Sequence, residues 1–158
     1  METWSLWDLD GCLSDCSLRM EALPDYERFH SLCGNDPVRG AEAALLRSWR
    51  WAEHRERRRV AILSGRTERW RGETDKWLLR NHLFGSVDRL LLRPNGDSRP
   101  SEVLKKGMVE DLMADKPSIN IAFAVDDLPK IVHMYKSIGI PALQSIVYHA
   151  GAEELTLP

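Results

Sequence analysis

Acidic and hydroxyl side chains follow three short apolar segments, and their types suit phosphate chemistry. The clusters are Asp8–Gly11, Ser64–Arg66 and Asp126–Asp127. Each is weak alone, because Asp-Gly is a common turn and Ser-Gly a common loop, but together they supply four carboxylates, a hydroxyl and an arginine. Clustered carboxylates repel one another unless a cation joins them, so a hard divalent ion is the expected partner.

The elements that position these clusters follow an alternating pattern. Short apolar runs separate helical segments, which favours parallel strands joined by crossover helices. In such a sheet, ligands bind outside the carboxyl ends of the strands, so the clusters should meet at one edge. We predict a doubly wound, Rossmann-like α/β fold, a three-layer sandwich with a parallel central sheet. The expected strands are 4–9, 60–63, 90–92, 119–125 and 142–148, and the expected helices are 37–57, 67–83, 102–113 and 130–137.

Length and composition indicate one ordinary globular domain. The 158 residues fit a single core, and 43% apolar with 29% charged residues excludes a disordered chain. We therefore expect one domain over 1–158. Residues 16–36 have no strong periodicity, and we predict that they form a small lid or cap over the site.

The formal net charge of −2 gives no overall attraction to nucleic acid, although 16 of the 22 basic residues are arginine. Arginine suits the bidentate binding of phosphate. Many of these arginines lie between Arg47 and Arg71, and we interpret the run 54–59 as a solvated helix end.

Nothing in the sequence predicts secretion or membrane contact. No apolar run approaches membrane-spanning length, and the N-terminus has no basic region followed by an apolar stretch. Three cysteines are a poor basis for a disulfide framework. We expect a cytoplasmic protein with reduced thiols, no membrane partner and no obligatory protein partner.

The motifs resemble those of the haloacid dehalogenase superfamily. The stretch 7–13 resembles its signature of two aspartates followed by Gly-Thr, 62–66 its second motif and 125–127 its acidic fourth motif. Further segments resemble the 3′-phosphatase domain of phage polynucleotide kinase–phosphatases, and they are 71–78, 92–100 and 103–105. The resemblance runs from Asp8 to about Gly151.

This resemblance implies a magnesium-dependent phosphatase. Asp8 would attack the phosphorus and form an aspartyl-phosphate, while Asp10 would protonate the leaving oxygen and later activate water. Magnesium would bind the Asp8 carboxylate, the Asp10 backbone carbonyl and Asp127. Asp126 would hold a metal-bound water or the lysine. Asp10 can donate a proton near neutral pH only if its pKa is raised, and we expect the neighbouring Asp8 to raise it.

The remaining implied roles concern the phosphate and the rest of the substrate. Ser64 and the Gly65 amide would hold the phosphoryl oxygens, although Ser64 could instead cap the next helix. Lys105 would neutralise the phosphoryl group, with Lys106 as the alternative. Three arginines would bind the rest of the substrate or brace the site, and they are Arg19, Arg66 and Arg93.

Two residues depart from the family pattern. Cys12 replaces the usual threonine after Gly11, a small-for-small change in the turn. Ser101 stands where the polynucleotide phosphatases have an aspartate that orients the lysine, and Glu102 is an uncertain substitute. These departures place the catalytic rate or the substrate specificity of the implied phosphatase in question.

Three functions remain open from the sequence. The leading one removes 3′-phosphates from nucleic-acid ends, as in nucleic-acid repair. No Gly-x-x-x-x-Gly-Lys-Ser/Thr loop occurs, so no kinase half is expected in this sequence. A phosphatase of nucleotides or other small phosphomonoesters keeps the same chemistry. A non-catalytic module that binds nucleic-acid ends is the third, favoured by Ser101, Cys12 and the arginine-rich helix, and disfavoured by the retained carboxylates and lysine.

Overall fold

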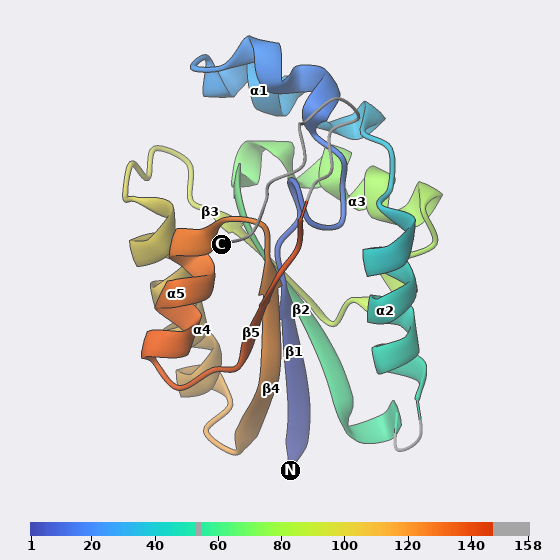
Figure 1. Ribbon diagram of the computed structural model, residues 1–158, viewed down its shortest axis with the longest axis vertical. Coiled ribbons are helices and arrows are strands. Elements are labelled where there is room, and N and C mark those ends of the chain that lie inside the picture. The colour runs from blue at the N-terminus through green and yellow to red at the C-terminus, as the bar shows by residue number, and fades with distance from the viewer. Residues whose placement is uncertain (53–54, 147–158) are drawn as a thin grey trace, which may run out of the picture.

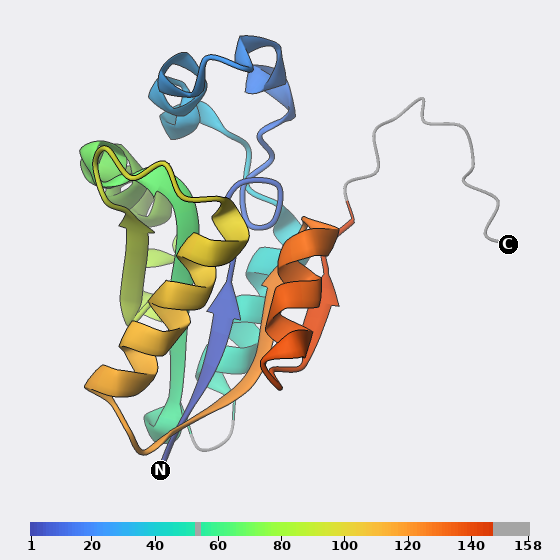
Figure 2. The same cartoon turned by 90° about the vertical axis from the view of Figure 1, so that its left-hand side faces the viewer.

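Five parallel strands form one sheet at the centre of the protein, and helices cover both of its faces (Figures 1 and 2). The computed structural model describes residues 1–52 and 55–146. The spatial order is β3-β2-β1-β4-β5. The strands are β1 (Glu2–Trp7), β2 (Arg58–Thr67), β3 (Arg89–Arg93), β4 (Ile119–Asp126) and β5 (Ala142–Gln144). The predicted three-layer α/β fold is therefore confirmed.

Four helices make the two outer layers. Helices α2 (Gly40–Trp51) and α3 (Arg71–Arg80) cover one face, and α4 (Ser101–Asp115) and α5 (Pro129–Ser137) cover the other (Figure 1). Short 3₁₀ turns complete the connections at Arg55–Arg57, Glu68–Trp70 and Phe84–Ser86. Each outer layer encloses its own hydrophobic core against the sheet.

The alternation of side chains along β2 explains both cores. Val60 and Ile62 lie in the cluster under α2 and α3, while Ala61 and Leu63 lie in the cluster under α4 and α5. All four are fully buried. A continuous apolar run is typical of a parallel strand covered on both faces, because successive side chains enter different cores.

The sheet reverses its strand order beside β1. From β1 the chain builds β2 and β3 on one side, and then crosses to β4 and β5 on the other. The carboxyl ends of β1 and β4 therefore flank the switch point, where open α/β sheets bind ligands. Asp8 follows β1 directly, and its backbone N–H donates to the carbonyl of Val125 in β4 at 2.9 Å.

The boundaries differ from the expected ones in two informative places. The helix expected to reach residue 57 ends at Trp51, and Arg58 and Arg59 are the first two residues of β2. Their backbones pair with Thr3 and Trp4 of β1, so the sheet extends beyond its apolar segment. The interpretation of 54–59 as a helix end is therefore wrong for its last two residues. The last expected strand, 142–148, ends at Gln144: Ser145 and Ile146 are not part of a strand, and residues 147 and 148 lie outside the described part of the chain.

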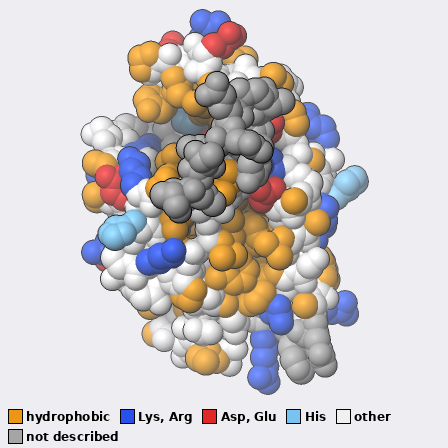
Figure 3. Space-filling model, viewed as in Figure 1, with side chains coloured by type: hydrophobic (Ala, Val, Ile, Leu, Met, Phe, Trp, Pro, Cys, Tyr) orange, Lys and Arg blue, Asp and Glu red, His pale blue; other side chains and the backbone are white. Residues whose placement is uncertain are grey.

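A small helical cap stands over the carboxyl ends of the strands, at the top of Figure 1. It consists of the 3₁₀ turn Ser17–Ala22, helix α1 (Tyr26–Ser31) and the 3₁₀ turn Cys33–Asn35. Hydrophobic side chains are visible on it (Figure 3). The segment coincides with the predicted lid 16–36, whose function as a lid stays a prediction, as does the single-domain organisation.

Among the residues that the structure describes, no helix is both long and apolar enough to cross a membrane.

Adjacent leucines in α2 provide a test of the layer under α2 and α3. Leu46 is fully buried in that core, whereas the Leu45 side chain is 48% exposed. We expect Leu46→Ala to lower the free energy of unfolding by about 2–5 kcal/mol, because it leaves a cavity. Leu45→Ala should change it by less than about 0.5 kcal/mol. Urea denaturation of both variants measures the difference, and equal effects would contradict this placement of α2.

Candidate active site

A buried lysine joins two carboxylates at the switch point. Lys105 Nζ donates to Asp8 Oδ1 at 2.5 Å and to Asp126 Oδ2 at 2.6 Å. Lys105 lies one turn inside α4 and is only 3% exposed. Lys106 instead lies 3.8 Å from Glu110 on the exposed face of α4. The contacts thus favour Lys105 over Lys106 as the lysine of the site.

Asp126 contacts and orients Lys105, although position 101 carries a serine. Asp126 Oδ2 accepts from Lys105, and Asp126 Oδ1 accepts from the backbone N–H of Leu128 at 3.0 Å. The second contact fixes the carboxylate at the end of β4. Glu102, the uncertain substitute, points elsewhere and lies 3.0 Å from Lys130. The lysine is therefore oriented although Ser101 has no carboxylate.

Burial and negative charge shape the electrostatics of this group. Burial raises the pKa of Asp8 well above its usual range, and Asp126 and Asp127 raise it further against the opposing Lys105 charge. Burial and the Asp126 charge raise the pKa of Asp127 to about 6. Burial disfavours the Lys105 ammonium, yet Asp8 and Asp126 outweigh it and raise the Lys105 pKa. Three carboxylates therefore surround one lysine, and negative charge is in excess.

The same three carboxylates could hold a metal ion. One oxygen each from Asp8, Asp126 and Asp127 lies within 4.8 Å of the others, and hard oxygen donors of this kind suit Mg²⁺. Gly11 allows this approach: it has a φ of +83°, and a Cβ there would collide with the Asp127 carboxylate. Both oxygens of Asp126 already accept hydrogen bonds, so Asp127 and Asp8 are the freer donors. The residues present thus fit a divalent cation.

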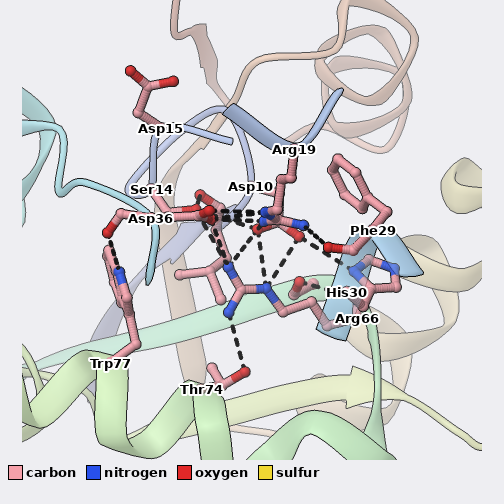
Figure 4. A network of polar contacts seen from close by, with 12 residues as sticks. Asp10, Ser14, Asp15, Arg19, Phe29, His30, Asp36, Arg66, Thr74 and Trp77 are labelled. Atoms are coloured by element: carbon pink, nitrogen blue, oxygen red, sulfur yellow. Dashed lines mark hydrogen bonds and ion pairs between the residues drawn. The ribbon is translucent and has the colours of Figure 1, made fainter. Parts of the chain in front are cut away.

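A second charged network surrounds Asp10 (Figure 4). Arg66 Nε donates to both Asp10 oxygens, at 3.0 and 3.1 Å, and Arg19 Nη2 also binds Asp10 Oδ1. Asp36, which follows the cap, accepts from Arg19 Nε at 2.8 Å and lies 3.4 Å from Arg66 Nη2. Two arginines and two aspartates thus balance each other beside the first cluster.

The arginines determine the charge of Asp10. Burial favours the neutral carboxyl, but Arg66 and Arg19 outweigh burial and hold the pKa of Asp10 well below its usual range. The expectation that Asp8 raises the pKa of Asp10 is therefore wrong for this structure. Asp8 is two residues away along the chain, whereas the two guanidinium groups contact the Asp10 oxygens directly.

The three predicted substrate arginines are placed differently. Arg66 is fully buried and also donates to Thr74 Oγ1 at 3.2 Å. Arg19 is 1% exposed, and its guanidinium lies 4.0 Å from the centre of the Phe29 ring. Arg93 lines the cavity beneath the cap and donates to the carbonyl of Gly65 at 3.3 Å. All three guanidinium groups are engaged by the protein, and their contacts with a substrate stay predictions.

Ser64 and Gly65 lie at the carboxyl end of β2 and line the same cavity. Ser64 Oγ accepts from the backbone N–H of Arg66 at 3.2 Å. The alternative that Ser64 caps the next helix is wrong, because α3 begins only at Arg71. Both residues are thus placed where a phosphoryl group beside Asp8 could contact them.

A cavity of about 680 Å³ lies between the cap and the strand ends. It is lined by residues of both clusters, including Asp8, Asp10, Ser64, Lys105 and Asp127. The basic stretch from Arg47 to Arg59 does not line it. Arg58 begins β2 six residues before Ser64, roughly 20 Å away along an extended strand. Those arginines therefore cannot contact the group held beside Asp8.

Two residues of the site carry no signal in the sequence. His30 of the cap is 9% exposed, and its Nδ1 lies 3.9 Å from Asp10 Oδ2 without a hydrogen-bond partner among the described residues. Arg39 donates to the carbonyl of Gly11 at 2.5 Å and to Ser145 Oγ at 2.9 Å. It thereby ties the loop after β1 to the segment after β5. Neither belongs to a recognisable spacing, so only the folded contacts reveal them.

Comparisons with known proteins identify the family of this chain. The family model for the polynucleotide kinase PNKP phosphatase domain matches residues 2–147. The chain belongs to this family. PNKP phosphatase domains are phosphatases of the haloacid dehalogenase superfamily, so the resemblance seen in the sequence is confirmed. No curated protein matches the chain.

Solved structures support the fold of this PNKP-type domain. A chain of the Pnkp1/Rnl/Hen1 complex is 24% identical, with a TM-score of 0.74 over 92% of this chain and 46% of that chain. CbbY from Rhodobacter sphaeroides in complex with phosphate is 15% identical, with a TM-score of 0.59 over 99% and 91%. A haloacid dehalogenase-like hydrolase from Streptococcus pneumoniae is 11% identical, with a TM-score of 0.60 over 90% and 84%. The chain spans less than half the length of the Pnkp1 complex chain.

The buried His30 predicts a specific pH dependence of stability. Burial, with Arg19 and Arg66, lowers the pKa of His30 to about 4, whereas a histidine in an unfolded chain titrates near 6.5. Between these values the unfolded state binds the extra proton, so His30 favours unfolding progressively as pH falls. We expect wild type to lose stability relative to His30→Gln between pH 7 and pH 4.5, by on the order of 1–3 kcal/mol. Urea denaturation of both proteins measures this, and a constant difference would contradict a neutral buried imidazole.

Proposed function

We propose that this domain is a magnesium-dependent phosphomonoesterase that removes 3′-phosphates from nucleic-acid ends through an aspartyl-phosphate. One observation carries the proposal: Lys105 is buried between Asp8 and Asp126 at the mouth of a cavity, in a chain of the PNKP phosphatase family. A buried lysine that contacts a carboxylate nucleophile can offset the charge of an incoming phosphate dianion.

In the first step an Asp8 oxygen attacks the phosphorus. The Asp8 O–P bond forms while the ester P–O bond breaks, and the leaving 3′-oxygen takes a proton. Lys105 and the Ser64–Gly65 segment are placed to bind the phosphoryl oxygens. When bound, the magnesium ion would be held by Asp8, Asp127 and the Asp10 carbonyl, and would stabilise negative charge on the phosphoryl group. The aspartyl-phosphate divides the hydrolysis into two easier reactions.

Asp10 is proposed as the proton donor and later the base. Its two arginine partners keep it ionised in this structure, so donation requires that they exchange Asp10 for another anion. A substrate phosphate is such an anion: its binding by Arg19 and Arg66 would remove the charges that lower the Asp10 pKa, so that Asp10 takes up a proton from solvent and donates it to the leaving 3′-oxygen. After the leaving group departs, the Asp10 carboxylate accepts a proton from water, whose oxygen attacks phosphorus and releases Asp8 and phosphate.

The proposal also specifies the substrate, a nucleic-acid end. The matched family is defined by polynucleotide kinases, and the cavity of about 680 Å³ exceeds what a phosphate alone occupies. The chain spans only part of the Pnkp1 chains, so a role in nucleic-acid repair is proposed for this domain by its likeness to them. A cytoplasmic location is proposed because the three cysteines are free thiols, and thiols stay reduced in the cytosol.

A substrate panel tests the activity and its nucleophile. We expect phosphate release from 3′-phosphorylated oligonucleotides with higher kcat/KM than from 3′-mononucleotides, sugar phosphates or 5′-phosphorylated oligonucleotides. Asp8→Asn should lower kcat at least about 10³-fold, because an amide cannot attack phosphorus, while the circular dichroism spectrum stays unchanged. Asp115→Asn, the same substitution at the exposed end of α4 and outside this cavity, is the matched control and should retain most activity.

Three results would each overturn a different part of this proposal. Near-wild-type activity of Asp8→Asn would remove Asp8 as the nucleophile. A higher kcat/KM for sugar phosphates or mononucleotides would leave the chemistry and make a small phosphomonoester the substrate. Absence of turnover with every compound would favour a module that binds nucleic-acid ends without catalysis.

Metal dependence gives a second prediction. We expect activity only with a divalent ion, with Mg²⁺ best and Ca²⁺ inhibitory, because Mg²⁺ imposes the tighter octahedral geometry. Asp127→Ala should weaken Mg²⁺ binding more than Asp126→Ala, since both Asp126 oxygens are already hydrogen-bonded. Calorimetric titration of Mg²⁺ into both variants measures the order. Full activity in excess chelator, or the reverse order of the variants, would contradict the metal assignment.

A further inference from the structure

The cavity above Asp8 has an apolar wall on the side of the cap. Four cap residues line it, and they are Met20, Leu23, Tyr26 and Phe29. None of them is needed to bind a phosphate, which interacts through charge and hydrogen bonds. The hydrophobic side chains of the cap, at the top of Figure 3, are therefore available for another part of the substrate.

Tyr26 is the solvent-exposed aromatic residue of this wall, and its ring lies at a tilt beside the His30 ring, with 6.3 Å between the ring centres. Its side chain is 64% exposed although it lines the cavity, whereas Phe29 is 6% exposed and has the Arg19 guanidinium over its ring. Tyr26 begins α1, where the preceding Asp25 accepts from the backbone N–H of Arg28 at 3.0 Å. This N-cap fixes the start of the helix and thus the backbone that carries the ring.

The remaining lining is polar and charged. It includes Arg93 at the end of β3, Asp97, Ser98 and Arg99 in the loop before α4, and Lys130 of α5. Arg99 is paired with Asp97 and Lys130 with Glu102. A ligand in this cavity would thus meet charge on one side and an aromatic, apolar surface on the other. A nucleotide has this division of chemistry, because its phosphates are anionic and its base is flat and weakly polar.

We propose that the cap wall centred on Tyr26 is a nucleobase subsite, which stacks on the base of the 3′-terminal nucleotide. The inference rests on the proposed function and adds to it the part of the substrate that the cap recognises. Aromatic stacking accepts every base, because each has a π-face. The subsite requires a base at the end of the strand and does not select among the four bases.

The test compares two strands that differ only in the terminal base. One oligonucleotide ends in a normal 3′-phosphorylated nucleotide, and the other ends in an abasic sugar 3′-phosphate. We expect wild type to prefer the first strand, with a ratio of the two kcat/KM values of about 10, the size typical of one base stacked on an aromatic ring. The ratio should be similar for all four terminal bases.

Three cap variants test whether the Tyr26 ring causes the ratio of the two kcat/KM values. Tyr26→Ala should reduce it to near 1, while Tyr26→Phe should keep it because the aromatic face remains. Leu18→Ala is the matched control: Leu18 is 76% exposed on the same cap but does not line the cavity, so the ratio should stay at the wild-type value. Circular dichroism verifies that each variant is folded.

The outcomes separate this subsite from the proposed activity. A wild-type ratio near 1, or an unchanged ratio in Tyr26→Ala, overturns the nucleobase subsite while turnover of both strands leaves the 3′-phosphatase in place. Hydrolysis of glycerol phosphate without hydrolysis of either strand overturns the proposed function, and the subsite with it. Loss of the ratio in Leu18→Ala would show a general effect of the cap and would also overturn the role of Tyr26.

Discussion

The burial of Lys105 between two carboxylates is the interaction on which the rest of the site depends. A charged group out of water persists only when it is paired and hydrogen-bonded, and Lys105 obtains both partners from the ends of β1 and β4. Removal of one partner from such a group is strongly destabilising, by about 3–5 kcal/mol. The contact therefore holds α4 against the sheet and also fixes the position of the Asp8 carboxylate, so the stability of this layer and the geometry of the candidate site depend on the same atoms.

The two charged clusters at the strand ends differ in their balance. Around Lys105, three carboxylates face one cation, and the surplus negative charge makes that cluster suitable for a metal ion. Around Asp10, two arginines face two aspartates, and no charge is left over. A phosphate dianion can use the first cluster only with added positive charge, and the second only by displacing a carboxylate from its arginine. The site is thus preformed for a cation and must rearrange for an anion.

The sequence predicts the features that follow from local residue patterns. It does not predict the features that arise from contacts between residues far apart in the chain. Periodicity gives the parallel sheet, the rule that strand ends share one edge gives the meeting of Asp8 and Asp126, and the family resemblance adds Lys105 of α4. The charge of Asp10 is set by Arg66, which lies 56 residues away in the chain, so no local pattern reveals it. Arg58 and Arg59 begin a strand because β1 offers them backbone partners, although their side chains are typical of a solvated helix end. His30 becomes part of the site only because the cap folds over Asp10.

The Arg39 contacts link parts of the chain that are far apart in sequence. One guanidinium nitrogen binds the carbonyl of Gly11 and the hydroxyl of Ser145, and the other binds the carbonyl of Ile146. Arg39 therefore connects the loop that contains Asp10 to the segment that follows β5. A substitution that shifts Ser145 or Ile146 would therefore move the guanidinium that contacts the backbone of Gly11, next to Asp10. Changes in the segment after β5 can thus reach Asp10 without altering any residue that lines the cavity.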